Sequence, residues 1–170
     1  MAFKEVNVNN LNINPFESIG KDWMLITSGD KEKFNTMTAS WGGLGVLWNK
    51  NVTFSFVRPQ RYTFEFLEKN DLYTLSFFNN NYRKALTLCG KVSGRDIDKV
   101  KESKLTPKFD NGFTYFEQAR LVLACKKIYT QFIDPNHFID DKIESNYENK
   151  DYHNMYVGEI ISCLVNEDNE

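Results

Sequence analysis

The chain has 170 residues, of which 41% are hydrophobic and 15% aromatic, and its 21 basic and 23 acidic side chains give a net charge of −2. This length predicts a single domain over residues 1–170, and the apolar content excludes a largely disordered chain. The lack of a basic excess argues against a dedicated nucleic-acid-binding protein.

Neither a membrane segment nor a metal site is indicated. No apolar run approaches the about 20 residues that cross a bilayer, and the first residues carry no secretory signal, so we expect a cytoplasmic protein without membrane contact. Cys89, Cys125 and Cys163 are widely spaced, and the histidines are His137 and His153. This pattern predicts buried free thiols and no bound metal.

The first third of the chain contains the clearest strand patterns. Residues 1–20 are polar and rich in asparagine, and we interpret them as an extended N-terminal arm. Strands are predicted over 23–27 and 34–39, with a Gly-Asp turn between them. Residues 52–57 alternate between polar and apolar side chains, which is typical of a half-buried strand, and Pro59 ends it.

The remainder of the chain mixes strands with short helices. Helices are predicted over 62–69, 82–90 and 95–104, and strands over 71–78, 119–129 and 156–164. Residues 166–170 are expected to form a disordered tail. Because strands outnumber helices and the two do not alternate strictly, the sequence predicts a mainly β fold with short helices. A β-barrel with helical crossovers fits this order better than a doubly wound parallel sheet.

A hydroxyl-rich strand end is the first candidate site. Thr36, Thr38 and Ser40 alternate, so their hydroxyls lie on one face of the strand and could hydrogen-bond a polar, planar ligand. The alternative is a half-solvated strand without a ligand. Trp41 and Trp48 flank a glycine-rich stretch, and they could either wall a slot for an aromatic ring or pack into a core.

Two arginines within four residues form the second candidate site. Arg58 and Arg61 follow a strong strand, and Thr63 lies at the start of the next predicted helix. The planar guanidinium suits phosphate, and a helix N-terminus also favours an anion. The alternative is a solvated turn with a charge-paired arginine. A turn over residues 90–96 adds one hydroxyl and further cations.

Several common signatures are excluded. Gly42, Gly43 and Gly45 lack the third glycine of a dinucleotide fingerprint, because Trp48 stands at that place. The sequence has no phosphate loop that ends in Gly-Lys-Ser/Thr and no Gly-x-Ser-x-Gly nucleophile elbow.

The candidate segments together resemble the flavin reductase-like family of FMN-binding split barrels, which includes flavoredoxin. The resemblance covers roughly residues 20 to 165 and rests on five segments in the family's order, at 23–42, 58–63, 75–78, 89–99 and 152–159. It implies a split β-barrel of Greek-key type, a homodimer and FMN bound near the subunit interface.

The resemblance also implies residue roles. The flavin ring and ribityl chain would contact Asn35, Thr36, Met37, Thr38, Ala39, Ser40 and Trp41. The phosphate would bind Arg58, Arg61 and Thr63, in agreement with the argument from anion chemistry. The pocket or its rim would include Ser76, Phe77, Tyr82, Ser93, Gly94 and Arg95. His153 matches a family position near the cofactor.

We therefore expect an FMN-binding oxidoreductase, in the first place a flavin reductase that uses NADH or NADPH. One alternative is a flavoredoxin-like carrier that exchanges electrons with a protein partner and does not oxidise nicotinamide. A second is a flavin-binding storage or sensing module without redox function. No side chain is expected to be essential as an acid or base, since the flavin itself accepts the hydride.

Overall fold

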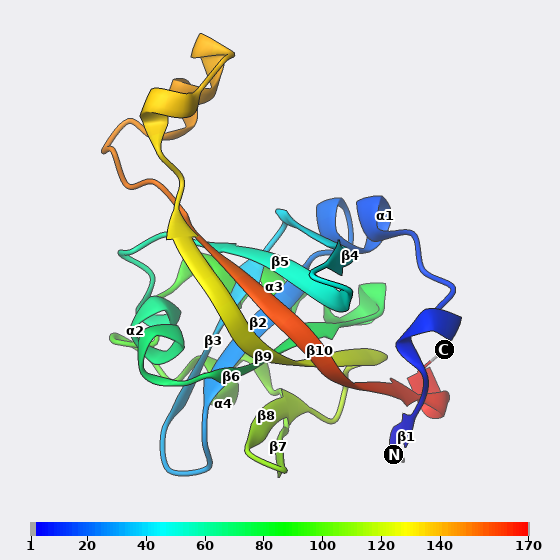
Figure 1. Ribbon diagram of the computed structural model, residues 1–170. Coiled ribbons are helices and arrows are strands. Elements are labelled where there is room, and N and C mark those ends of the chain that lie inside the picture. The colour runs from blue at the N-terminus through cyan, green and yellow to red at the C-terminus, as the bar shows by residue number, and fades with distance from the viewer. Residues whose placement is uncertain (1–2, 170) are drawn as a thin grey trace.

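The computed structural model describes residues 3–169 (Figure 1). Its main feature is an eight-stranded antiparallel sheet in the order β3-β2-β6-β9-β10-β5-β4, with β1 also paired to β10. The strands of this sheet are β1 (Phe3–Glu5), β2 (Met24–Gly29), β3 (Phe34–Ala39), β4 (Gly42–Leu47), β5 (Lys50–Val57), β6 (Leu72–Phe77), β9 (Leu121–Phe132) and β10 (Asn154–Asn166). A separate hairpin pairs β7 (Pro107–Asp110) with β8 (Phe113–Phe116).

The sheet curls around one apolar core, and the ends of its path, β3 and β4, are not paired with each other. The side chains of Met24, Leu75, Phe77 and Tyr156 lie in this core and are fully buried. The mainly β class and the split-barrel architecture expected from the sequence are therefore confirmed.

Four α-helices flank the barrel in the part of the chain that the structure describes: α1 (Pro15–Gly20), α2 (Tyr62–Lys69), α3 (Arg83–Lys91) and α4 (Lys99–Ser103). Helix α2 contributes Leu67 to the barrel core. Helix α3 covers the other face of the sheet, where Leu86 and Cys89 pack with Leu25 in a second apolar cluster. All three cysteines are free and buried, as predicted.

Strand β10 depends on a glycine at the point where its pairing with β9 shifts. The register shifts between Val157 and Gly158. A Cβ atom at Gly158 would lie 2.1 Å from Tyr73 Oη and 3.0 Å from Cys125 Cβ. Since no side chain fits there, the glycine allows β6 and β9 to approach β10 closely.

The expectations for the two termini are partly wrong. The N-terminal arm is not extended throughout, because Asn14 caps Phe16 N–H and Pro15 begins helix α1. The expected tail over 166–170 is ordered as far as it is described. Asn166 is fully buried, ends β10 and donates to the carbonyl of Glu117, and a 3-10 turn follows over Glu167–Asn169. Glu170 lies outside the described residues.

Three further parts of the fold were not predicted. The first is strand β4, whose glycines suggested a loop, and the second is the hairpin of β7 and β8, two short strands without clear alternation. The third is the connection between β9 and β10, residues 133–153, which we call the β9–β10 excursion. Figure 1 shows it projecting from the barrel, and Ile139 near its tip is 99% exposed. Within residues 3–169, no helix has the length and apolar character to span a membrane.

Candidate functional site

A small cavity, which we call the slot, lies where β3, β5, α2 and β10 meet. Its volume is about 230 Å³. Its lining residues are Met37, Thr38, Ala39, Ser40, Trp41, Phe56, Arg58, Arg61 and His153. All of them except Phe56 were predicted from the sequence. The structure thus gathers the end of the hydroxyl-rich strand, both arginines and the histidine around one opening.

Two of the three predicted hydroxyls are used inside the protein. Thr36 pairs with Thr27 and Thr38 with Leu25 of β2, so both side chains share one face of β3, as the alternation predicts. Thr36 Oγ1 lies 2.8 Å from Thr27 Oγ1, and the Thr38 hydroxyl donates to the Leu86 carbonyl. These hydroxyls fasten β3 to β2 and α3, whereas Ser40 is exposed at the slot.

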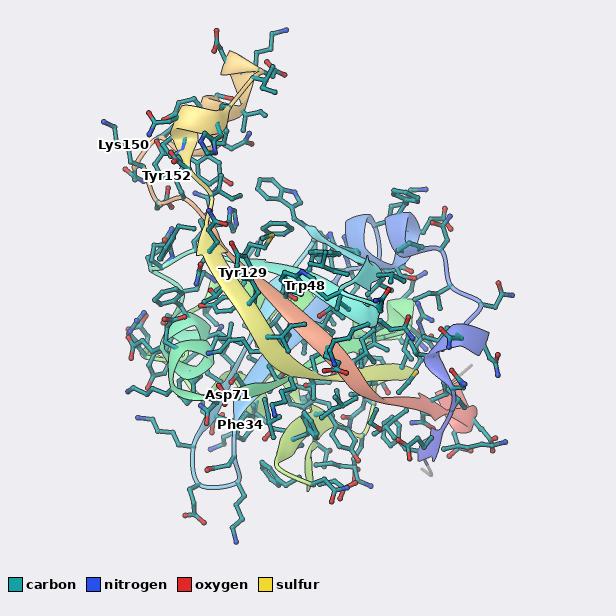
Figure 2. All side chains as sticks on the ribbon, in the orientation of Figure 1. Phe34, Trp48, Asp71, Tyr129, Lys150 and Tyr152 are labelled. Atoms are coloured by element: carbon teal, nitrogen blue, oxygen red, sulfur yellow. The ribbon has the colours of Figure 1, made fainter. Side chains whose placement is uncertain are left out.

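Three aromatic rings form one wall of the slot. The centroid of the Trp41 ring lies 5.2 Å from that of His153, and the Phe56 ring meets His153 edge-on at 6.4 Å. Trp41 is 47% exposed, so this wall reaches the surface. Trp48 lies elsewhere: Figure 2 labels it near Tyr129, and the two rings are 5.8 Å apart. Of the two tryptophans considered, Trp41 alone lines the slot.

His153 is held neutral at physiological pH. Its side chain is buried, and its Nδ1 lies 2.8 Å from the Tyr147 hydroxyl. Burial, together with the charge of Arg58, lowers the pKa of His153 to about 4, although Asp151 acts in the opposite direction. A neutral imidazole can pack against a planar ring. At pH 7 it is not an imidazolium and so does not act as a cationic proton donor.

The two arginines of the slot differ in their partners. Arg58 Nη1 lies 2.7 Å from Asp151 Oδ2 and Arg58 Nη2 donates to the Asn146 carbonyl at 2.8 Å, so its charge is paired. Arg61 donates to the Gly90 carbonyl at 3.0 Å and, at 3.5 Å, to that of Cys89. Among residues 3–169, no carboxylate lies within ion-pair distance of Arg61.

Lys99 is a buried cation beside the half-buried Arg61. Its ammonium donates to the carbonyls of Thr36 and Cys89, each at 2.9 Å, and the residue is 4% exposed. Burial and the neighbouring Arg61 lower the pKa of Lys99 to about 8. Two positive side chains therefore converge on the carbonyl of Cys89. Uncompensated buried charge is costly, so this arrangement favours an anion nearby.

Asn35, Thr63 and Gly94 form a packed cluster behind the slot. Asn35 Nδ2 donates to Thr63 Oγ1 at 2.8 Å, and both residues are buried. A Cβ atom at Gly94 would lie 2.1 Å from Asn35 Oδ1. Thr63 is thus a partner of Asn35 and does not line the slot, which differs from its expected place at the phosphate.

Arg95 lies beside a separate cavity of about 650 Å³, which Asn35, Gly94 and Lys99 also line. Its guanidinium stacks 4.7 Å from the centre of the Tyr62 ring and forms an ion pair with Glu65. Arg95 is therefore paired within the protein.

Four other predicted residues lie away from the slot. Ser76 pairs with Leu25 and Val122 in the middle of the sheet, and Phe77 belongs to the barrel core. Tyr82 packs against Phe78, with ring centroids 5.9 Å apart, and the Ser93 hydroxyl accepts the Arg95 N–H at 3.2 Å. The order of motifs along the chain does not reveal which face of the sheet each one occupies.

A second small cavity extends the slot along α3. It measures about 220 Å³ and is lined by Trp23, Thr38, Ser40, Leu86, Thr87, Gly90 and Lys91. It shares Thr38 and Ser40 with the slot, so the two hollows adjoin. A larger cavity of about 720 Å³ lies beside the N-terminal segment, near Leu11 and Arg120, and none of the predicted site residues lines it. The convergence of cations and rings identifies the slot, despite its smaller size, as the functional site.

Sequence reasoning missed Phe56 and Lys99. Phe56 lies in the alternating strand β5, and its position on the slot side could have been inferred once Arg58, two residues later, was a candidate. Lys99 ends the segment 89–99 that carries the resemblance, but it was not singled out, because a lysine in a short helix rich in charged residues is typical of a solvated surface.

Solved structures of similar shape define the class of the fold. A flavoredoxin from Methanosarcina acetivorans matches with a TM-score of 0.68 and 22% identity, over 86% of this chain and 69% of that chain. An FMN-binding domain of a flavin reductases-like enzyme from Shewanella baltica OS155 matches with a TM-score of 0.69 and 15% identity, over 96% of this chain and 77% of that chain. An NADH:FAD oxidoreductase from Streptomyces globisporus C-1027 matches with a TM-score of 0.64 and 14% identity, over 88% of this chain and 78% of that chain. The fold is thus a flavin reductase-like split barrel.

The sequence itself gives the family. Residues 16–170 match the flavin reductase like domain, and we conclude that the chain belongs to the flavin reductase-like family. No curated protein matches the sequence.

Proposed function

We propose that this protein is an FMN-binding oxidoreductase that reduces flavin with NADH or NADPH. The observation that carries the proposal is the pair of cations, the buried Lys99 and the half-buried Arg61, that meet at the Cys89 carbonyl without a carboxylate partner among the described residues. A phosphate monoester is dianionic at neutral pH and would compensate both charges. Family membership supports an oxidoreductase of this type.

The slot suits a flavin mononucleotide in two further respects. Trp41, Phe56 and His153 offer ring faces and edges against which a planar heterocycle packs well. Arg61 uses two of its five N–H donors on α3 carbonyls and keeps the others for phosphate oxygens. Of the predicted phosphate ligands, we place Arg61 first, because Arg58 is paired with Asp151 and Thr63 with Asn35.

When bound, the flavin supplies the redox chemistry, since its ring accepts a hydride and passes electrons on. The chain's own residues bind and orient it. The ring wall limits the entry of water, while the half-exposed Trp41 leaves one side open to a donor. His153, neutral at pH 7, fixes the wall through its contact with Tyr147. No acid–base pair is required of these side chains.

A flavoredoxin-like electron carrier is the second candidate function. The exposed edge at Trp41 would let a protein donor approach the slot. Flavoredoxins from Methanosarcina acetivorans and from Desulfovibrio vulgaris (Miyazaki F) share the fold. The two candidates differ in one property: the carrier keeps FMN bound and does not oxidise nicotinamide.

We also propose that the protein acts as a homodimer. Ligand pockets usually measure about 300–1,000 Å³, whereas the slot measures about 230 Å³ and its rim is open. The outer part of the β9–β10 excursion projects from the barrel, with the apolar Ile139 exposed, and Figure 2 shows Lys150 and Tyr152 on this projection, although Asn146 and Asp151 contact Arg58. A second copy would cover this surface, and two-fold dimers are the commonest assembly.

The experiment that tests the function is anaerobic reduction of the FMN-loaded protein. We expect NADH or NADPH to bleach the flavin absorbance within a single turnover. A protein that binds FMN but is reduced by neither nicotinamide would be the electron carrier. A protein that does not bind FMN would refute both candidates.

A further inference from the structure

We propose that the large cavity beside the N-terminal segment binds a small amphipathic carboxylate, and that Arg120 binds the carboxylate group. We call it the terminal cavity, because residues from both ends of the chain line it, with Lys4 and Leu11 from one end and Val165 and Glu167 from the other. Its volume of about 720 Å³ is that of a small-molecule site, about 300–1,000 Å³. It shares no lining residue with the slot, so the inference is independent of the proposed function.

The N-terminal segment forms one wall of the terminal cavity and is fastened to the barrel. Strand β1 pairs with β10, with Lys4 opposite Val165. Further along, Asn9 accepts a hydrogen bond of 3.0 Å from Asn51 on β5, and Pro15 then begins helix α1. Figure 1 shows β1 and the end of β10 on the opposite side of the barrel from the β9–β10 excursion. The surface of the proposed dimer therefore leaves this cavity open.

The floor of the terminal cavity is apolar. Phe78 and Leu121 are almost fully buried beneath it. Leu11, Ile13 and Val165 are partly buried and pack against the barrel core. Such a floor accommodates the apolar part of a ligand, because removal of apolar surface from water is favourable. We therefore expect a ligand with an aromatic or alkyl body.

Arg120 brings to this floor a charge that the protein pairs poorly. Its backbone is fixed, because its N–H donates to the Phe77 carbonyl at 2.8 Å and its carbonyl accepts from Asn166 N–H at 3.0 Å. Its side chain is 24% exposed, and Nη2 lies 3.3 Å from Ser18 Oγ and 3.9 Å from Asp22 Oδ2. Hydrogen bonds from nitrogen to oxygen usually measure about 2.7–3.2 Å. The Asp22 carboxylate thus lies beyond hydrogen-bond distance.

The unused donors of Arg120 favour an anion in the cavity. A guanidinium has five N–H donors, and among the described residues the Ser18 hydroxyl is the one acceptor of a side-chain hydrogen bond from Arg120. A charge removed from water is costly unless it is paired, and a carboxylate accepts two parallel bonds from a guanidinium. Lys4, the other cation that lines the cavity, is largely exposed and pairs with Glu167 at 3.5 Å. Arg120 is therefore the residue that recognises the acid.

The acidic residues of the terminal cavity narrow the class of ligand further. Asp22 and Glu167 both line it, and their charges repel a second anion. This repulsion is stronger for a phosphate dianion than for a singly charged carboxylate. The site therefore fits a monocarboxylic acid with an apolar body better than a phosphate ester.

The test uses naphthoate and its neutral analogue naphthamide, each titrated into the full chain by isothermal calorimetry. In the wild type we expect naphthoate to bind about 10-fold or more tightly than naphthamide, because a hydrogen bond to a charged group is stronger than one between neutral groups. Arg120→Met should lower the affinity for naphthoate to that for naphthamide. Leu11→Asn removes part of the apolar floor and should weaken both ligands by a similar factor.

Lys4→Met is the matched control, because Lys4 lines the same cavity but is exposed and paired, and it should change naphthoate affinity less than about threefold. Arg61→Ala shows whether naphthoate enters the slot instead. Thermal unfolding shows whether each variant is folded, and the wild-type comparison of the two ligands stands even if Arg120→Met does not fold. A wild type that binds both ligands equally, or neither, would overturn the inference. So would a loss of naphthoate binding in Arg61→Ala that exceeds the loss in Arg120→Met.

Discussion

His153 illustrates how burial sets the chemistry of a single residue. The sequence presents it as the one histidine near the expected cofactor, and the structure encloses it between Trp41, Phe56 and Tyr147. Its pKa of about 4 makes it a neutral wall at pH 7. A general acid would need a pKa near the working pH, so the structure supports a packing role for this histidine.

The lowered pKa of His153 predicts a loss of stability in acid. The folded state has a pKa of about 4 and the unfolded state about 6.5, so the unfolded state binds more protons between these values. The free energy of unfolding should fall by up to about 3 kcal/mol as the pH drops from 6.5 to 4, at about 1.4 kcal/mol per pKa unit. Urea unfolding at several pH values measures this loss.

The control for this measurement is His153→Gln, which cannot take up the proton. The variant should lose less stability than the wild type over the same pH range. A loss equal to that of the wild type would assign the acid sensitivity to other groups.

At the scale of elements, the sequence predicted the strands and helices that have a clear local pattern of apolar and polar residues. Strand β3 and helix α2 begin and end where the patterns indicate, and β5 was recognised from its alternating side chains. Strand β4 was not, since its glycines carry no apolar alternation and its place is decided by pairing with β5. Local pattern therefore identifies elements, whereas tertiary pairing decides the ambiguous ones.

The same division applies to the site. Met37, Ala39, Trp41 and the two arginines could be placed together from motif and resemblance. Lys99 and Phe56 could not, because their role follows from packing across α4, α3 and β5. Thr63 and Ser76 were expected at the pocket, yet Thr63 on helix α2 bonds Asn35, and Ser76 lies in the middle of the sheet.

Gly158 provides a prediction for strand β10. Gly158→Ala places a Cβ atom 2.1 Å from Tyr73 Oη, so the core must shift. We expect a loss of about 1–3 kcal/mol in the free energy of unfolding, as in other overpacked cores. Gly45→Ala is the control, since its Cβ atom would meet its nearest neighbour, Phe54 Cε2, at an ordinary 3.6 Å. Equal losses in urea unfolding would contradict the close approach of β6 to β10.

At the scale of the whole molecule, the outer part of the β9–β10 excursion exposes apolar residues, although its end contacts Arg58 through Asn146 and Asp151. Phe132 at its base is 50% exposed and Ile139 near its tip is 99% exposed. Such surface on an extended segment is typical of an interface between chains. In the proposed homodimer, this exposed apolar surface would lie in the interface.

The dimer prediction is tested by the mass in solution. Light scattering should give about twice 19.9 kDa at micromolar concentration. Ile139→Asp, which places a charge in the expected interface, should shift the protein towards the monomer. Lys150→Ala, on the same excursion but exposed and charged, should not. A wild type that remains at the monomer mass would refute the dimer.

The central claim is that the slot binds a flavin through its phosphate at Arg61. Titration of FMN and riboflavin against the wild type, Arg61→Ala and Arg58→Ala tests it most directly. A charge-assisted hydrogen bond contributes about 1.5–3 kcal/mol, and 1.4 kcal/mol corresponds to tenfold in affinity. Arg61→Ala should therefore weaken FMN binding about 10- to 100-fold, Arg58→Ala less, and riboflavin binding should barely change. Equal losses for FMN and riboflavin in Arg61→Ala would contradict the account.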